Sequence, residues 1–298
     1  MATKRTSVYQ KLSQNLSRGL QFGIWGAFGG CAGSLLTELL IPQFWAETNT
    51  SAVSIAVEVG IWFGIIGICI AIALLIGHSK YLKKKTQVKK ALLIGSPVGL
   101  IAGFVAGAIA QGIYTAVGPT EVLRIICWGI AGGLLGLGLS VRVPNLGILR
   151  GFAGGCIGGL IGGSLFVVFT LLVNQILGRL FGVAAIGFFI GLMIVLVEAV
   201  LREAWLVVHW TPTEYKTISL GRQPIILGSS DDSHVYLRKD HGYPPVTAKV
   251  FMQGKNIFME FDEAMRTQKG MKILKQELHD GDRRKLGGVT LEVKTSKG

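Results

Sequence analysis

The sequence predicts two parts of different fold class: an all-α polytopic membrane bundle of six helices in three hairpins, and then a small all-β sandwich. Half of the 298 residues are hydrophobic and only 16% are charged, whereas soluble domains carry about 25% charged residues. Glycines recur at four-residue spacing within the apolar runs. After residue 211 these runs end, and apolar residues alternate with polar ones.

Six apolar segments are long enough to cross a bilayer, which requires about 20 residues per helix. They cover residues 19–41, 52–77, 91–117, 121–141, 151–173 and 180–201. The cysteines lie inside these segments without metal-ligand spacing, at Cys31, Cys69, Cys127 and Cys156. We interpret them as small apolar side chains, and we expect no metal and no cofactor.

Glycine ladders mark the third and fifth segments, and single GxxxG pairs mark the even-numbered ones. A glycine costs a helix in water about 1 kcal/mol relative to alanine, but in a bilayer a glycine stripe lets two helix backbones touch. We predict helix packing for Gly95, Gly99, Gly103, Gly107, Gly151, Gly155, Gly159, Gly163, Gly60, Gly64, Gly129, Gly133, Gly187 and Gly191. The repeated pattern indicates three hairpins of similar design. The same glycine faces also allow a homo-oligomer.

The charges between the segments predict the orientation in the membrane. Thirteen Lys and Arg residues occupy one set of connections and two occupy the other, and the basic side faces the cytoplasm. Both termini are then cytoplasmic, in a bacterial inner membrane. The net charge of +13 reflects this topology and attraction to lipid, so we expect no nucleic-acid partner. The predicted parts are a basic segment at 1–18, a transmembrane domain at 19–208, a linker at 209–214 and a cytoplasmic domain at 215–298.

Three ionisable residues are predicted near the outer membrane face: Glu38, Glu58 and Arg124. Charged groups at membrane depth are costly and commonly functional, but ion pairing at helix ends or snorkelling to the interface is the simpler explanation for such residues, and we favour it. We keep two interpretations of this outer charge cluster. It is a set of helix-end ion pairs, or it is the mouth of a solute or proton site.

The C-terminal part has the two-residue period of β-strands. Ile257, Met259 and Phe261 share one face of a strand, and Val289, Leu291 and Val293 share one face of another. Turn sequences such as Asp280-Gly281-Asp282 separate the runs. Short alternating strands with regular turns are typical of a β-sandwich.

Residues 215–293 resemble a forkhead-associated (FHA) domain of the FHA/SMAD-like fold. The matching runs are Ile226-Leu227-Gly228-Ser229-Ser230-Asp231-Asp232-Ser233-His234-Val235-Tyr236-Leu237, Val246-Thr247-Ala248-Lys249-Val250, Leu278-His279-Asp280-Gly281-Asp282 and Leu286-Gly287. The run from Val197 to Trp205 is similar to bacterial membrane proteins that join a glycine-rich bundle to such a domain. The resemblance implies a module that binds other proteins in signalling.

The residues that would bind phosphothreonine in this family are replaced here. The resemblance implies an Arg after the first Gly, a Ser-x-x-His segment and an Asn-Gly. This chain has Ser229 after Gly228, Pro244 and Thr247 in the second motif, and Lys269 before Gly270. A phosphate requires charge-assisted donors such as the bidentate Arg fork. We therefore expect phosphothreonine binding to be lost.

Two functions are consistent with these sequence features. The first is a non-enzymatic membrane adaptor or scaffold, anchored in the lipid bilayer, whose FHA-like domain binds a cytoplasmic protein partner. The alternative is a channel or transporter for a small solute or ion, regulated by that domain, with Glu38, Glu58 and Arg124 near its mouth. An enzyme is not expected, because no nucleophile–base pair, metal constellation or phosphate loop is present in the sequence.

Overall fold

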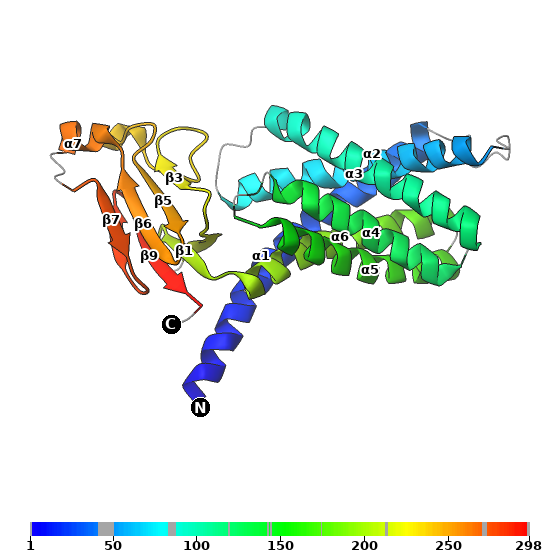
Figure 1. Cartoon of the computed structure of the whole chain (residues 1–298), viewed down its shortest axis with the longest axis horizontal. Coiled ribbons are helices and arrows are strands. Elements are labelled where there is room, and N and C mark those ends of the chain that lie inside the picture. Colours follow the sequence, from blue (N-terminus) through cyan, green and yellow to red (C-terminus); the bar gives the residue numbers. More distant parts are fainter. Residues whose placement is uncertain are drawn as a thin grey trace. The chain divides into compact units, whose positions relative to one another are not determined.

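A computed structural model describes residues 2–40, 51–82, 88–118, 120–141, 143, 145–173, 175–211, 214–269 and 273–296. The chain divides into two compact units, and each is described here by itself. One unit holds the long helices and the other holds the strands (Figure 1). The Lys83-Lys84-Lys85 loop, residues 212 and 213 of the predicted linker, and Gly270 lie outside the described residues.

In the described ranges, six long helices form the helical unit, one for each predicted segment. They are α1 (Ala2–Leu40), α2 (Ala52–Tyr81), α3 (Val88–Val117), α4 (Glu121–Ser140), α5 (Ile148–Leu172) and α6 (Gln175–Leu201). The segment predicted at 1–18 is therefore not separate from the bundle, because it continues into α1. Its N-terminal end extends beyond the other helices (Figure 1).

Among the helices that the structure describes, five are long and apolar enough to cross a membrane, namely α2 to α6. The described part of α1 does not meet this criterion, although the sequence predicts a membrane helix there. Polar and small residues, among them Gln21, Ser34 and Glu38, dilute its apolar content. The five apolar helices are compatible with membrane insertion.

The six helices meet their neighbours at glycines in a closed ring. An added Cβ would meet the neighbouring helix in each of these pairs: Gly33 with Ile66, Gly99 with Gly67, Gly138 with Val98, Gly155 with Gly132, Gly158 with Ile190, and Gly26 with Gly187. These contacts join α1 to α2, α2 to α3, α3 to α4, α4 to α5, α5 to α6, and α6 back to α1. Backbones approach this closely only where a side chain is missing.

The ladder glycines join helices of different predicted hairpins. Gly95, Gly99, Gly103 and Gly107 on α3 lie against α2, and Gly151, Gly155, Gly159 and Gly163 on α5 lie against α4. The glycine pairs of the even-numbered helices also contact a neighbouring helix: Gly60 and Gly64 face α3, Gly129 and Gly133 face α5, and Gly187 and Gly191 face α1. The ladders thus lie between successive hairpins rather than inside them.

The described residues of the second unit form nine strands and one short α-helix. They are β1 (Ala204–His209), β2 (Tyr215–Ser219), β3 (Ile225–Gly228), β4 (Val235–Tyr236), β5 (Ala248–Gln253), β6 (Asn256–Phe261), α7 (Glu263–Lys269), β7 (Lys275–Leu278), β8 (Arg283–Leu286) and β9 (Val289–Thr295). The strands form two sheets, in the orders β2-β1-β9-β8 and β4-β3-β5-β6-β7.

In each sheet, apolar residues that the two-residue period places on one face of a strand are buried. On β6 the side chains of Ile257, Met259 and Phe261 are buried, and on β9 those of Val289, Leu291 and Val293 are buried. Strand β1 departs from this alternation, because all five residues from Ala204 to Val208 are buried. A two-sheet region with an apolar interior is consistent with the FHA-like sandwich predicted from the sequence.

The β unit starts earlier than the sequence predicts. The predicted transmembrane domain ends at residue 208, but α6 ends at Leu201 and β1 begins at Ala204. Strand β1 pairs with β2 on one side and with β9 on the other, and Trp205 is buried in the β unit rather than in the aromatic belt of a membrane helix. The sequence of Ala204–His209 is consistent with either the end of a helix or a buried strand, and only its pairing with β2 and β9 distinguishes the two.

Two short described segments between the long helices belong to the β unit: residues 79–82, which include the end of α2, and residues 143, 145 and 146, between α4 and α5. The Tyr81 hydroxyl accepts a hydrogen bond from the Thr217 amide at 3.1 Å and donates to the Thr217 carbonyl at 3.4 Å. The Asn145 amide donates to the carbonyls of Ser219 and Gln223 at 3.1 and 2.9 Å. Since β2 lies at the edge of the described sheet, these side chains satisfy backbone groups on its outer side.

Candidate functional site

The residues at the FHA ligand positions come together in the loops around β3 and β5. Gly228 lies against the Pro245 carbonyl. The Ser229 amide donates to the Pro244 carbonyl at 3.1 Å, and the Ser229 hydroxyl donates to the Tyr243 carbonyl at 2.8 Å. The loops therefore bring four of the six predicted positions together: Gly228, Ser229, Pro244 and Thr247.

The polar groups at these positions form hydrogen bonds within the loops themselves. The completely buried Thr247 donates its hydroxyl to the Pro244 carbonyl at 3.3 Å. Neither this hydroxyl nor that of Ser229 is positioned as a donor for an outside anion. Lys269 lies at the end of α7 and Gly270 lies outside the described residues, so their predicted role stays a prediction. Among the four described positions there is no cationic side chain to hold a phosphate.

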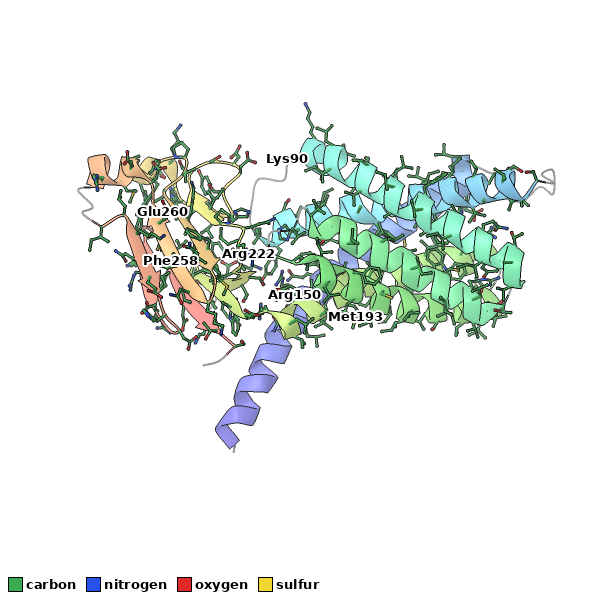
Figure 2. The ribbon with its side chains drawn as sticks, in the orientation of Figure 1. Lys90, Arg150, Met193, Arg222, Phe258 and Glu260 are labelled. Atoms are coloured by element: carbon green, nitrogen blue, oxygen red, sulfur yellow. The ribbon has the colours of Figure 1, made fainter. Side chains whose placement is uncertain are left out.

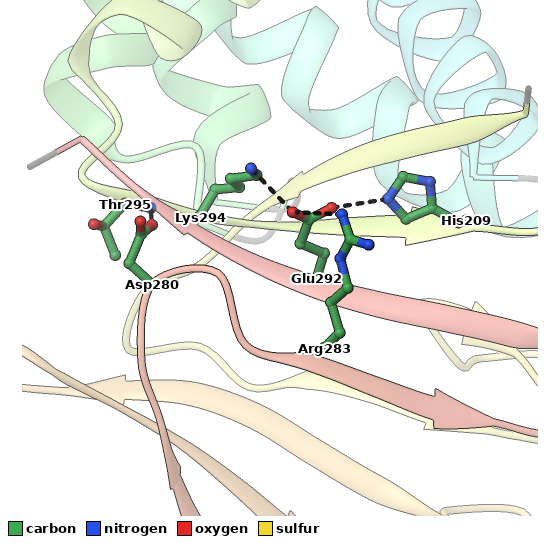
Figure 3. A network of polar contacts seen from close by, with 6 residues as sticks. All are labelled: His209, Asp280, Arg283, Glu292, Lys294 and Thr295. Carbon is green, nitrogen blue, oxygen red and sulfur yellow. Dashed lines mark hydrogen bonds and ion pairs between the residues drawn. The ribbon is translucent and has the colours of Figure 1, made fainter. Parts of the chain in front are cut away.

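A second polar cluster lies on the first sheet, where Glu292 of β9 accepts three contacts (Figure 3). Lys294 Nζ is 3.0 Å away, Arg283 Nη2 3.3 Å and His209 Nε2 3.2 Å. Burial disfavours the charged carboxylate, but hydrogen bonds from Lys294, Arg283 and His209 outweigh it and hold the pKa of Glu292 below its usual value. Three strands contribute to this cluster, so it stabilises the sheet.

The outward face of the second sheet carries an aromatic pair. Phe251 and Phe258 are cross-strand partners on β5 and β6, with ring centroids 6.2 Å apart. The Lys275 ammonium lies 4.6 Å from the Phe258 ring, which is cation–π range. Phe258 and its neighbour Glu260 are seen on β6 in Figure 2. Both side chains are half-buried, and aromatic residues are enriched at protein interfaces.

The outer charge cluster is partly assembled in the helical unit. Glu58 and Arg124 line one cavity of about 580 Å³, together with Arg179. Glu38 bonds Arg179 Nε at 2.6 Å, and Arg124 bonds Glu121 at 2.9 Å on its own helix. Arg179 was not predicted as part of the cluster, because its partner Glu38 is 141 positions away. No sequence pattern signals such a distant pair.

Metal ligation has no support in the described part of the chain. Among those residues, no group of three His, Cys, Asp or Glu side chains could hold a metal ion.

Comparison with known proteins gives two solved structures that each match about a third of this chain. No family model matches the chain, and no curated protein matches it. One solved structure comes from a structural and functional analysis of phosphothreonine-dependent FHA domain interactions. It has 18% identity and a TM-score of 0.25, and the match covers 32% of this chain and 97% of that chain.

A second solved structure is the FhaA FHA domain complexed with the intracellular domain of Rv3910. It also has 18% identity and a TM-score of 0.25, and the match covers 30% of this chain and 99% of that chain. The described chain itself has a C-terminal unit of two β-sheets and a helical unit with five apolar helices.

Proposed function

We propose that this chain is a membrane-anchored, non-enzymatic adaptor that presents an FHA-like sandwich to a cytoplasmic protein partner, without phosphothreonine binding. The main support for the loss of phosphothreonine binding is that the polar groups at the FHA ligand positions form hydrogen bonds within the loops. The hydroxyls of Ser229 and Thr247 donate to backbone carbonyls within the loops. A phosphate bound there would find no arginine fork at these positions.

The membrane part of the proposal rests on composition. Five of the described helices are apolar enough to span a bilayer, and the basic connections favour a cytoplasmic location of both termini. The glycine contacts between helices support a packed bundle as the anchor.

Peptide binding to the full chain in a non-ionic detergent tests the loss of phosphothreonine recognition. Each phosphothreonine peptide is compared with its unphosphorylated copy. We expect equal binding of both forms. A preference of tenfold or more for the phosphorylated form, abolished by Ser229→Ala, would contradict this part of the proposal.

Partner capture tests the adaptor role. The full chain and a chain ending at Val200 are both cross-linked in their native membrane, and bound proteins are compared. We expect a partner that the full chain retains and the shortened chain loses. Phe258→Ala, on the outward aromatic pair, should weaken this capture, whereas Val53→Ala at the start of α2 should not. Equal recovery of partner proteins by the shortened chain would contradict the adaptor role.

The cavity at Glu58 favours the channel or transporter as a second candidate. Solute and ion flux into liposomes carrying the full chain is the direct measurement, with Glu58→Gln as the variant that should alter it. Absence of flux in the wild-type chain would remove this candidate and leave the adaptor untouched.

A further inference from the structure

The cavity in the helical unit is lined by residues from five helices. They belong to α2, α3, α4, α5 and α6, which are consecutive members of the glycine-packed ring. The cavity therefore lies between these helices rather than on the outer surface of one helix pair. Its volume of about 580 Å³ is in the range of small-molecule sites.

The cavity has a polar end near the helix termini and an aromatic end deeper in the bundle. On α2 the lining runs from Ile55, near the helix start, to Phe63, a depth of about 12 Å at 1.5 Å per residue. On α4 it runs from Arg124 to Trp128, and on α5 it reaches Phe166. The deepest lining residue on each of these three helices is aromatic.

These aromatic rings are in contact and form a continuous floor. Phe63 stacks on Trp128 with centroids 4.5 Å apart, and Phe166 approaches Trp128 at 5.5 Å. Trp62 meets Trp128 edge-on at 6.0 Å. Such a surface favours a flat apolar or aromatic group, because aromatic rings stack on one another or meet edge-on at these distances.

The charged groups at the polar end already have partners within the protein. Arg179 Nε bonds Glu38 at 2.6 Å, and Arg124 Nη1 bonds Glu121 at 2.9 Å. Glu58 and Arg179 each have a further interaction in the fold. A charged ligand would have to compete with these partners and give up its own hydration, which is costly in an apolar site.

The other polar side chains of the lining carry no charge at neutral pH. They are Gln111, Tyr114 and Thr170. Arg124 bonds the Tyr114 hydroxyl, and Thr170 donates its hydroxyl to the Val167 carbonyl at 2.9 Å. The lining therefore offers a ligand mainly apolar and aromatic contacts.

We propose that this cavity binds a small, neutral aromatic molecule. Its flat ring system would rest against Phe63, Trp128 and Phe166, in stacked or edge-on contact. A neutral ligand gains the free energy of burying its apolar surface and leaves the ion pairs at the polar end intact. This inference stands apart from the adaptor proposal.

Charged ligands of either sign fit the lining less well. A cation would suit the aromatic rings, but it would meet Arg124 and Arg179 in the same cavity. An anion would meet Glu58, and it would compete with Glu38 and Glu121 for the arginines. A neutral molecule meets neither obstacle.

Energy transfer from tryptophan to a bound probe, measured on the full chain in non-ionic detergent, tests the proposal. Trp62 and Trp128 line the cavity, so they are close donors for a fluorophore inside it. The neutral probe is N-phenylnaphthylamine. Its anionic counterpart is anilinonaphthalenesulfonate, and the cationic one is a trimethylammonium derivative of the same ring system. We expect saturable transfer to the neutral probe, with a dissociation constant about tenfold or more below those of both charged probes.

Filling the cavity should expel the probe. Ala110 of α3 is buried and lines the cavity, so Ala110→Phe places a ring in the space of the ligand and should weaken binding about tenfold or more. Ala116→Phe on the same helix is the matched control, because Ala116 is exposed and outside the lining, and it should bind the probe as the wild type does. If gel filtration shows that Ala110→Phe is not folded, Val59→Phe in the α2 part of the lining carries the test.

Several results would overturn the proposal. They are the absence of saturable transfer to the neutral probe, equal or tighter binding of a charged probe, and wild-type affinity in a folded Ala110→Phe chain, which would locate the probe in the detergent or elsewhere on the protein. Tighter binding of the ammonium probe, lost in Glu58→Gln, would instead identify a cation site. None of these outcomes depends on partner capture by the β unit, so the failure of one proposal leaves the other standing.

Discussion

At the scale of single residues, Tyr81 at the end of α2 and Asn145 between α4 and α5 bond the free edge of β2. Thr217 pairs with Val207 of β1 on one side, and its own amide and carbonyl bond the Tyr81 hydroxyl. The Asn145 side chain donates a hydrogen bond to the Ser219 carbonyl and accepts one from the Gln223 amide. It does so from a left-handed backbone conformation with φ 59°, which asparagine tolerates better than most residues.

Replacing Tyr81 by Phe should loosen this edge. The ring remains, but the buried Thr217 amide loses its acceptor, which costs about 1–3 kcal/mol. Hydrogen–deuterium exchange of the β2 peptide in the full chain is the measurement, and exchange should accelerate. Tyr236→Phe is the control, because Tyr236 is 44% exposed on β4. Unchanged β2 protection in Tyr81→Phe would show that the edge does not depend on this hydroxyl.

The Glu292 cluster predicts acid sensitivity of the first sheet. A carboxyl group whose pKa is lowered by folding stabilises the folded state above its unfolded pKa of about 4.3, and this contribution is lost as pH falls through the folded pKa. The lowered pKa of Glu292 should therefore make the β unit lose stability below about pH 4.

Glu292→Gln should remove most of that pH dependence and lower stability at neutral pH by about 1–3 kcal/mol. Urea unfolding of the full chain, followed by fluorine NMR of a fluorotryptophan at Trp205, reports on this sheet. Glu277→Gln on the exposed face of β7 is the control and should behave as the wild type. An unaltered pH profile in Glu292→Gln would mean that other carboxyl groups govern acid unfolding.

At the scale of elements, three of the close helix pairs have the same contact between a glycine and a phenylalanine. Gly60, Gly133 and Gly23 each face a phenylalanine of the partner helix: Phe104, Phe152 and Phe188 respectively. These contacts join α2 to α3, α4 to α5 and α1 to α6. A large flat ring over a glycine fills the space that close backbones leave, which favours dense packing.

Gly155→Ala should destabilise the bundle by about 1–3 kcal/mol or more. Its new Cβ would collide with the Gly132 carbonyl, which is backbone and yields little. The midpoint of thermal unfolding in detergent is the measurement. Gly112→Ala on α3 is the matched control, since a Cβ there meets nothing within 4 Å, and it should be neutral or slightly stabilising. Equal midpoints for the two variants would argue against close packing of α4 and α5.

We expect a fragment of the β unit to fold only if it includes strand β1. Its two neighbours in the sheet are β2 and β9, so a chain starting at residue 211 lacks the strand between them. We expect residues 211–298 to be largely unfolded by circular dichroism, and residues 201–298 to show more β-structure. A folded 211–298 fragment would show that β2 and β9 do not require β1.

At the scale of the whole molecule, the β unit is built from three separate stretches of chain. Besides the C-terminal part, it includes residues at the end of α2 and residues between α4 and α5. A module on a simple tether would share no residues with its anchor. The two units are therefore joined at several points of the sequence, so binding by the β unit is best measured on the full chain.

The candidate sites were predictable to different degrees. Gly228, Ser229, Pro244 and Thr247 are close together, and the resemblance named them in advance. The cavity was not predictable in the same way. Glu58 and Arg124 were named, but Arg179, Trp62 and Trp128 join them only through the ring of helices. Residues on five helices share no local spacing, so no sequence period reports their proximity.

The sequence by itself determined the six helices, the alternating strands and the positions of the glycines, because hydrophobic period and turn residues act locally. Tertiary structure alone decided three matters. The ladders join α2 to α3 and α4 to α5 rather than the helices of one hairpin. Residues 204–209 are a strand because β2 and β9 pair with them. Glu38 of α1 meets Arg179 of the neighbouring helix α6. Each depends on partners distant in sequence, and only the folded chain brings them together.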